Sequence, residues 1–396
     1  MLLFPFLTAF LATCFIYPKV LRIALEKNIV DNPDARKLQR IPIPVLGGAP
    51  GFFGVMAGLC CANLFVDCSG LFPVVAAMVI ILMVGIIDDI INLSPRVRFL
   101  IEILLVLFLA YATGNMIDDF HGLWGLYRVS AWLAVPLTVV AGVGIINAIN
   151  LIDGVDGLSS GFCIQSCLLF GIMFYLRGDL PMLVLALLCV AALLPFFFHN
   201  VFGARSKMFI GDGGTLVMGV LAASFVMHIL SSQSSAATID HRIGLIPFTL
   251  AVMSVPVFDT LRVMTARIVR GHSPFKPDKT HLHHLFIDLG FSHIGTTVSI
   301  LTLNLSVVVI WWASYLMGAS IEVQFYLVLV LSILSTFVFY RYMRIQIKGH
   351  TAVYRFMSAI GRKTHIKHQG CILRLQRYLD RVAPKYNLRT SRLHVT

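Results

Sequence analysis

Long apolar runs, separated by short polar loops, occupy most of this 396-residue chain. Runs of roughly 16 to 22 residues are long enough for α-helices that cross the hydrocarbon core of a bilayer. Hydrophobic residues make up 58% of the sequence and charged residues only 13%, which excludes an ordinary soluble domain. We therefore predict an all-α, polytopic membrane protein with about eleven transmembrane helices. The runs are Leu2–Leu21, Val45–Phe65, Leu71–Ile87, Phe99–Thr113, Ala131–Ile149, Leu158–Leu176, Met182–Phe198, Thr215–Leu230, Ile243–Leu261, Thr296–Met317 and Val323–Tyr340.

The loops between these runs alternate in charge. Loops that carry few charges, or acids such as Asp67, Asp118 and Asp119, alternate with basic loops. Because loops rich in lysine and arginine stay in the cytoplasm, an odd number of helices places the N-terminus outside and the C-terminus in the cytoplasm. The net charge of +12 thus indicates membrane sidedness, and we expect no nucleic-acid partner. The basic loop residues are Lys27, Arg36, Lys37, Arg40, Arg96, Arg98, Arg205, Lys207, Arg262, Arg267, Arg270, Lys276 and Lys279.

Composition divides the chain into a membrane domain, residues 1–343, and a basic cytoplasmic tail, residues 344–396. The first run lacks a basic leader and a cleavage pattern, so we expect a retained helix. In the tail, Ile372, Leu375, Leu379 and Val382 recur at helical spacing. That spacing is compatible with an amphipathic helix on an anionic membrane surface, and a solvated basic tail is the alternative. The eight cysteines lie mostly in apolar runs and are predicted to be reduced packing residues.

Acidic and amide side chains gather at two of the cytoplasmic helix ends. Asp88 and Asp89 follow each other where the third run ends, and such a pair needs a metal or a basic group to relieve its repulsion unless water solvates the helix end. A second cluster lies at the cytoplasmic end of the fifth run, with glycines that let the chain turn. Hard cations such as Mg²⁺ prefer oxygen ligands of this kind. The residues of the second cluster are Asn147, Asn150, Asp153 and Asp156.

Asp212 stands between glycines just before the eighth run. Backbone N–H groups and a carboxylate at a helix N-terminus can bind a metal-bridged phosphate, and a simple turn is the alternative. Phe209, three residues upstream, is positioned either to stack on a nucleotide base or to anchor the loop in the membrane interface.

Histidines dominate the loop after the ninth run. His281, His283 and His284 follow Lys279, and no cysteine accompanies them, so contacts with phosphate are favoured over a zinc site. In the first cytoplasmic loop, Arg36 and Lys37 serve as charge markers or bind the phosphate of a lipid. Together these clusters predict a metal-dependent active site that serves a lipid. A cation-coupled transporter is the alternative, although transporters usually hold their substrate near the midplane.

Five motifs, in this order, resemble those of the polyprenyl-phosphate N-acetylhexosamine-1-phosphate transferases. The resemblance covers roughly residues 30–345, and the basic tail lies largely outside it. The motifs are Pro42-Ile-Pro44 with Gly47-Gly48, Asp88-Asp89 with Leu93-Ser-Pro-Arg-Val-Arg98-Phe99, Asn147 to Leu158, Gly211-Asp-Gly-Gly214, and His281-Leu-His-His284. Thr215 stands where family members commonly have serine, which keeps the hydroxyl group.

The resemblance implies an enzyme of the bacterial inner membrane with its active site on the cytoplasmic face. A phosphate oxygen of undecaprenyl phosphate attacks the β-phosphorus of a UDP-N-acetylhexosamine, giving the polyprenyl-diphospho-sugar and UMP. Family members need Mg²⁺ or Mn²⁺. Because a phosphate monoester loses its second proton near pH ~6, we expect positioning and charge neutralisation to matter more than a base, and a two-step route through an aspartyl intermediate is less favoured.

The resemblance also implies a role for each candidate residue. Asp212 and Asn150 are the expected metal ligands, and Asp88 or Asp89 orients or deprotonates the acceptor phosphate. Asp153 and Asp156 help to position the nucleotide sugar, Phe209 stacks near uracil, and His281, His283 and His284 meet the diphosphate or the sugar. The remaining candidates for substrate binding are Arg36, Lys37, Asn147 and Lys279.

Leu282 interrupts the histidines, whereas the muramoyl-pentapeptide branch usually shows three in a row. The loop therefore resembles the branch that uses UDP-N-acetylglucosamine to begin O-antigen, enterobacterial common antigen or teichoic-acid linkage units. Another UDP-linked N-acetylhexosamine remains an alternative donor for this loop. The sequence is also compatible with a homodimer.

Overall fold

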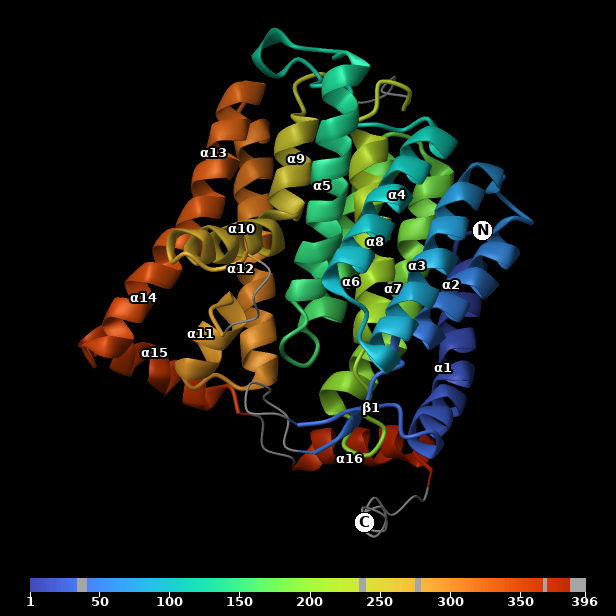
Figure 1. Cartoon of the computed structure of the whole chain (residues 1–396), viewed down its shortest axis with the longest axis vertical. Helices are drawn as coiled ribbons and strands as arrows, with labels where there is room; N and C mark the ends of the chain where they lie inside the picture. Colours follow the sequence, from blue (N-terminus) through green and yellow to red (C-terminus); the bar gives the residue numbers. More distant parts are fainter. Residues whose placement is uncertain (34–40, 235–239, 275–278, 366–368, 385–396) are drawn as a thin grey trace.

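The computed structural model describes residues 1–33, 41–234, 240–274, 279–365 and 369–384. Within these residues the chain is overwhelmingly helical, and most of its long helices run roughly parallel (Figure 1). The first part of the chain contains α1 (Leu3–Glu26), α2 (Gly48–Ala62), η1 (Ser69–Leu71), α3 (Phe72–Ile91), α4 (Pro95–Thr113), η2 (Leu123–Gly125), α5 (Ala131–Leu151), α6 (Leu158–Leu176), α7 (Leu180–Phe202) and α8 (Gly211–Ile229). The second part contains α9 (Leu245–Val252), α10 (Ser254–Val269), α11 (Leu282–Asp288), α12 (His293–Leu316), α13 (Ile321–Ile333), η3 (Leu334–Val338), α14 (Phe339–Lys348), α15 (Ala352–Lys363), α16 (Gly370–Leu379) and η4 (Asp380–Val382).

Eight helices of the described residues are long and apolar enough to cross a membrane. The number is nine if α9 and α10, which meet at a bend of 72°, form one broken span. The helical, polytopic architecture is thereby confirmed, whereas the count of eleven spans and the sides on which the termini lie remain predictions. Two further apolar runs form shorter or more polar helices: α2 has 15 residues, and α4 carries Arg96, Arg98 and Glu102.

Helix α8 is the buried axis of the bundle, with 89% of its apolar stretch inside the protein. Small residues let its neighbours approach closely, as in many membrane helix pairs. A Cβ atom on Gly48 would lie 2.3 Å from Gly214 Cα, and one on Gly85 would lie 2.4 Å from Gly213 Cα. The starts of α2 and α8 and the last turns of α3 therefore meet backbone to backbone, which brings the aspartates of α3 next to Asp212.

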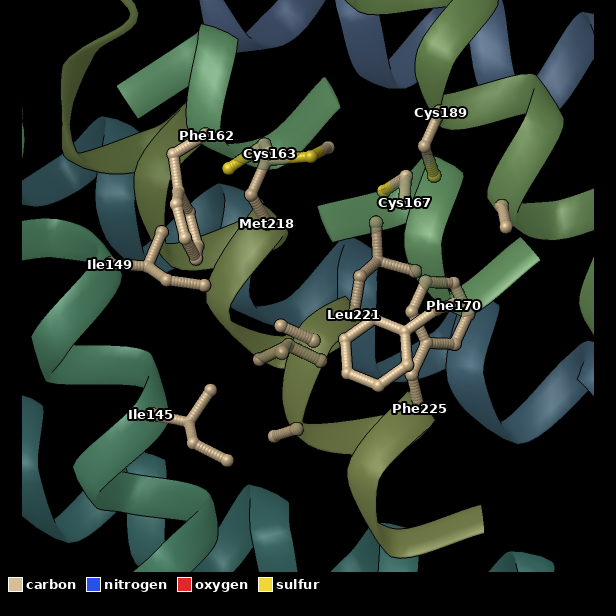
Figure 2. Packing of buried hydrophobic residues seen from close by; sticks show 14 of the residues in the cluster. Ile145, Ile149, Phe162, Cys163, Cys167, Phe170, Cys189, Met218, Leu221 and Phe225 are labelled. Carbon is tan, nitrogen blue, oxygen red and sulfur yellow. The ribbon is translucent and has the colours of Figure 1, made fainter. Parts of the chain in front are cut away.

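Figure 2 shows the apolar packing around α8. Phe170 of α6 packs against Phe225 of α8, with ring centroids 5.6 Å apart, and α5 contributes Ile145 and Ile149 on another side. Cys163, Cys167 and Cys189 lie in the same core as free, buried thiols. These contacts fix the axial position of α8, and with it the position of the polar residues at its N-terminus.

Two short elements depart from the all-α prediction. Strands β1 (Val30–Asp31) and β2 (Ile43–Pro44) pair antiparallel, with Val30 opposite Pro44. The carbonyl oxygen of Pro44 then accepts a hydrogen bond from the Phe209 amide (2.7 Å), and the amide of Gly47 donates to the Phe209 carbonyl (2.9 Å). The Pro-x-Pro and Gly-Gly motif therefore secures the segment that leads into α8.

The C-terminal segments cross one end of the molecule. Residues Ile321–Lys348 form one continuous helical span through α13, η3 and α14, so the predicted boundary at residue 343 falls inside α14. Beyond it, α15 and α16 run along the end of the molecule at which β1 lies (Figure 1). A helix at Ile372–Leu379 is confirmed by α16, and its contact with a membrane surface remains a prediction.

Candidate active site

A polar cavity of about 950 Å³ is lined by residues of β1 and α11, among others. Figure 1 shows where these two elements lie in the molecule. The walls of the cavity bring together members of all four predicted clusters, so the expectation that these clusters share one end of the molecule is confirmed. Asn147 and Lys279 do not line this cavity, and Arg36 and Lys37 fall outside the described residues. The predicted residues that do line it are Asp88, Asp89, Asn150, Asp153, Asp156, Phe209, Asp212, His281, His283 and His284.

Asp89 caps the N-terminus of α8. Its carboxylate accepts hydrogen bonds from the backbone amides of Asp212 (2.9 Å) and Gly213 (3.2 Å). The prediction that these amides bind a phosphate is wrong for these two groups, because a protein carboxylate already accepts their hydrogen bonds. The simple-turn alternative is also wrong, since Gly211 to Gly214 form the first turn of α8.

Asp212 and Asn150 face each other across the cavity wall. The Asn150 amide nitrogen donates to Asp212 Oδ1 (2.6 Å) and to the hydroxyl of Thr215 (2.8 Å). Thr215 therefore uses the hydroxyl group that it shares with serine, the residue that family members commonly have at this position. The amide oxygen of Asn150 takes no part in these two bonds and, with the Asp212 carboxylate, forms a pair of hard oxygen donors.

Arg98 joins the carboxylates of α3, α4 and α8. Its guanidinium lies 3.1 Å from Asp88 Oδ2, 3.5 Å from Glu102 Oε1 and 3.9 Å from Asp212 Oδ2. The basic group that the Asp88-Asp89 pair was predicted to need is thus present for Asp88. Glu102, whose side chain is fully buried, also accepts a hydrogen bond from the Asn147 amide (2.5 Å). Asn147 therefore supports this network from behind the cavity.

Asp156 is held from two sides. Lys207 Nζ donates to its Oδ2 at 2.6 Å, and His293 Nδ1 lies 2.7 Å from the same oxygen. Burial alone would raise the pKa of Asp156, but the hydrogen bond from His293 and the charge of Lys207 lower it below its ordinary value. Asp156 is therefore ionised at neutral pH, with two partners from loops that are far apart in the sequence.

Asp153, three residues earlier, behaves in the opposite way. It accepts a hydrogen bond from the Ser159 hydroxyl (2.5 Å), yet removal from bulk water, followed by repulsion from Asp212 and Asp156, raises its pKa to about 7. Its side chain remains exposed to the cavity, and water there reduces the shift. The two aspartates of this loop consequently differ in their tendency to carry charge.

The histidine loop is oriented by a carboxylate from α10. Asp259 accepts hydrogen bonds from His281 Nδ1 (2.9 Å) and from the Leu282 amide (3.2 Å), and it pairs with Arg262 at 2.6 Å. Arg262 in turn stacks on Tyr340, with the guanidinium carbon 3.7 Å from the ring centroid. All of these groups except the tyrosine are buried, so the direction of the His281 ring is fixed from behind.

His283 packs directly against the loop after α5. A Cβ atom on Gly154 would lie 2.0 Å from His283 Nε2, so only glycine leaves room for this ring. The ring of His284 is also close, with a centroid separation of 4.3 Å. Burial, then the neighbouring His284 and His281, lower the pKa of His283 well below its ordinary value, so its ring is neutral at neutral pH.

The donor atoms at this site suit a partly hydrated hard cation. Within the described part of the chain, no group of three or more histidine, cysteine, aspartate or glutamate side chains is arranged to enclose an ion. The histidines at the start of α11 are therefore not part of such a group. Mg²⁺ usually takes one or two carboxylates and completes its shell with water and substrate phosphates, which Asp212 and Asn150 would permit.

Comparisons with known proteins bear directly on this site. The glycosyl transferase family 4 profile matches residues 71–230, which include Asp88, Asp153 and Asp212. The chain is 33% identical over 321 residues to the "probable undecaprenyl-phosphate N-acetylglucosaminyl 1-phosphate transferase" of Bacillus subtilis, an alignment that covers 78% of this chain and 87% of that protein. The chain belongs to the polyprenyl-phosphate N-acetylhexosamine-1-phosphate transferase family.

Other members of this transferase family show similar relationships. The "undecaprenyl-phosphate alpha-N-acetylglucosaminyl 1-phosphate transferase" of Yersinia pestis is 28% identical over 282 residues, with 68% of this chain and 73% of that protein covered. The "decaprenyl-phosphate N-acetylglucosaminephosphotransferase" of Mycolicibacterium smegmatis is 33% identical over 311 residues, with 72% and 75% covered. These relatives are transferases, so they give no support to the transporter alternative.

Several residues that shape this transferase site had no predicted role. Arg98 belongs to the Leu93–Phe99 motif, but the motif gave it no role, although the acid Glu102 one turn later inside an apolar run was a signal for a buried pair. Lys207 was predicted only as a basic loop residue. His293 and Asp259 carried no local signal, because their partners Asp156 and His281 are 137 and 22 residues away in the chain.

Proposed function

We propose that this membrane transferase moves N-acetylglucosamine-1-phosphate from UDP-N-acetylglucosamine to undecaprenyl phosphate and releases UMP. The observation that carries the proposal is that acidic, basic, imidazole and aromatic groups line one cavity. The names of the relatives, which refer to undecaprenyl or decaprenyl phosphate and N-acetylglucosamine, support the same reaction.

We further propose that the enzyme lies in the bacterial inner membrane with this cavity facing the cytoplasm. Lys27, Lys207 and Arg267 line the cavity, and basic residues of this kind mark cytoplasmic loops. A cytoplasmic opening gives access to a nucleotide sugar, which is soluble, while the polyprenyl chain of the acceptor stays in the leaflet. The product would begin a cell-surface polysaccharide such as an O-antigen, and another UDP-N-acetylhexosamine remains the alternative donor.

The reaction exchanges one phosphorus–oxygen bond for another. An oxygen of the acceptor phosphate attacks the β-phosphorus, and the bond from that phosphorus to the bridging oxygen breaks, leaving its electron pair on UMP. At neutral pH the acceptor is already mostly a dianion, because its second pKa is near ~6. The protein therefore contributes mainly by holding two anionic groups in line and by neutralising their charge.

Asp212 and Asn150 are the proposed ligands of Mg²⁺ or Mn²⁺. When bound, the ion would neutralise charge on the donor diphosphate. Asp88 and Asp89 act beside it by position rather than as bases: Asp88 holds Arg98 (3.1 Å), and Asp89 fixes the first turn of α8 (2.9 Å to the Asp212 amide). Arg98 would then offer its charge to the acceptor or donor phosphate.

The donor occupies the other half of the cavity in this proposal. Phe209 offers its ring to uracil, and Asp156, held by Lys207 and His293, positions the nucleotide sugar together with Asp153. His281, whose Nδ1 lies 2.9 Å from Asp259, lines the cavity and meets the diphosphate or the sugar in this proposal. His283 and His284 complete the surface that meets the diphosphate or the sugar.

Release of UMP by detergent-purified protein tests the proposal. The protein is given Mg²⁺, undecaprenyl phosphate and UDP-N-acetylglucosamine, with UDP-N-acetylgalactosamine and UDP-muramoyl-pentapeptide in parallel. UMP that appears only with the lipid and with UDP-N-acetylglucosamine supports the proposal, whereas turnover of a different donor alone would replace the sugar. Phosphorylated protein after incubation with β-labelled donor and no lipid would replace direct attack by the two-step route.

A further inference from the structure

The C-terminal tail makes a specific contact with the loop between α7 and α8, residues 203–210. Asp380 is the only acid after Tyr340. Its Oδ1 atom accepts hydrogen bonds from three successive backbone amides, those of Ala204 (3.1 Å), Arg205 (2.9 Å) and Ser206 (2.9 Å), and from the Ser206 hydroxyl (2.9 Å). Successive N–H groups that converge in this way form an anion-binding nest. The contact therefore selects a carboxylate from a tail that is otherwise basic.

The same loop is anchored from inside the bundle. The Tyr17 hydroxyl donates to the carbonyl oxygen of Ser206 (2.7 Å), and His199 Nδ1 lies 3.0 Å from the Ser206 hydroxyl. Ser206 is completely buried between these groups and Asp380. Its successor is Lys207, whose ammonium group bonds to Asp156 in the cavity. The direction in which Lys207 leaves the loop is therefore set by contacts at Ser206.

A second part of the tail holds the loop on the other side of Asp156. The Ser292 amide donates to the Thr364 hydroxyl oxygen (3.0 Å), and the Ser292 hydroxyl donates to the Thr364 carbonyl oxygen (2.8 Å). The tail fits closely here, because a Cβ atom on Gly361 would lie 2.8 Å from the Leu289 carbonyl oxygen. The next residue after Ser292 is His293, the other partner of Asp156.

We propose that the tail is a strap that positions Lys207 and His293 on Asp156, with Asp380 and Thr364 as its two positioning residues. The strap spans two loops that are about 85 residues apart in the chain and meet on one carboxylate. A cavity of about 180 Å³ beneath it is lined by Asp156 and His293 together with His365 and Ile372 of the tail, so the tail reaches the wall of the site itself. The consequence for donor binding rests on the proposed function.

The geometry at Asp380 distinguishes a positioning role from a general contribution of the tail. All four hydrogen bonds end on Oδ1, and asparagine keeps an oxygen at this position, whereas alanine does not. Asp380→Asn should therefore retain most of the function and Asp380→Ala should lose it. Asp67→Ala is the control, because Asp67 accepts a backbone hydrogen bond from Ser69 (2.9 Å) in the loop that follows the end of α2, whereas it is the start of α2 that contacts α8 near the site.

The first test measures steady-state kinetics of the full-length protein. We expect Asp380→Ala to raise the KM for UDP-N-acetylglucosamine about tenfold, as the loss of one charge-assisted contact would. The KM for undecaprenyl phosphate should stay within about twofold. Because Asp380 acts through Lys207, the Asp380→Ala change should have less than about a twofold effect when made in Lys207→Ala. Additive effects in this cycle, or equal rises in both KM values, would overturn the proposal.

The second test does not depend on activity. Trypsin cleaves after Arg205, and we expect Asp380→Ala to speed this cleavage about fivefold or more, while Asp380→Asn and Asp67→Ala stay within about twofold of the unaltered protein. Unchanged cleavage in Asp380→Ala would overturn the strap. If the unaltered protein turns over no UDP-sugar but cleavage still depends on Asp380, the strap stands and the proposed function fails.

Discussion

The close approach of Gly154 to His283 gives a sharp prediction about the histidine loop. In Gly154→Ala the new Cβ atom would lie 2.0 Å from His283 Nε2, 2.4 Å from Cε1 and 2.6 Å from Cδ2. Ordinary van der Waals contact begins near 3.4 Å, so the imidazole must move by more than an ångström. His283 is buried between His281 and His284 and has little room to do so. A displacement of about 1 Å at a reacting site can cost about 10²-fold in rate, and we expect a loss of that order in kcat/KM.

The assay is lipid-dependent UMP release, with folding checked by the thermal midpoint in detergent. Gly144→Ala is the control: Gly144 lies in α5, the helix that precedes the loop of Gly154, its Cβ would meet nothing within 4 Å, and alanine favours a helix there. The control should keep full activity. Gly154→Ala with an unchanged midpoint and activity within about threefold of the unaltered protein would refute the claim that His283 acts from this position.

Three further predictions follow from the same site. Asp212→Asn should lower kcat by about 10³-fold or more at every Mg²⁺ concentration while leaving membrane insertion intact, and substantial Mg²⁺-dependent turnover would remove Asp212 from the metal site. Arg98→Gln should lower the unfolding free energy by about 3 kcal/mol, because it leaves Glu102 buried without its cation, and adding Glu102→Gln should restore much of the loss; a double variant no better than the single one would contradict the pairing. Burial lowers the pKa of His283 well below its ordinary value, so at low pH the unfolded chain takes up a proton that the folded chain does not, and stability should fall as the pH drops from 7 to 5. His283→Gln should flatten the dependence of Tm on pH between 7 and 5, and equal slopes would show that His283 titrates normally.

The helices and the chemical class of the site were predictable from the sequence because their signals are local. Apolar runs such as Ala131–Ile149 and Leu158–Leu176 coincide closely with α5 and α6, since a bilayer requires uninterrupted apolar helices. The alternation of basic and non-basic loops likewise predicted that Asp88, Asp156 and Asp212 lie on the same side of the membrane. All three residues line the cavity.

The pairings inside the site depend on tertiary packing and had no local signal. Asp88 and Asp89 are adjacent in sequence, yet they point to different partners: Asp88 meets Arg98, and Asp89 meets the backbone of α8. The glycine contacts between α2, α3 and α8 decide this, because they bring the start of α8 against the end of α3. Asp380 bonds to Ser206, which is 174 residues away in the sequence, and the basic composition of the tail gave no reason to expect this contact.

The most direct test of the account follows the β-phosphorus of the donor. UDP-N-acetylglucosamine labelled with ³²P at the β position, or separately at the α position, is incubated with purified protein, Mg²⁺ and undecaprenyl phosphate, and the lipid is extracted. Transfer of the sugar phosphate predicts β-label in the lipid and α-label only in soluble UMP. Label left in UDP or released as inorganic phosphate, with none in the lipid, would contradict a sugar-1-phosphate transferase.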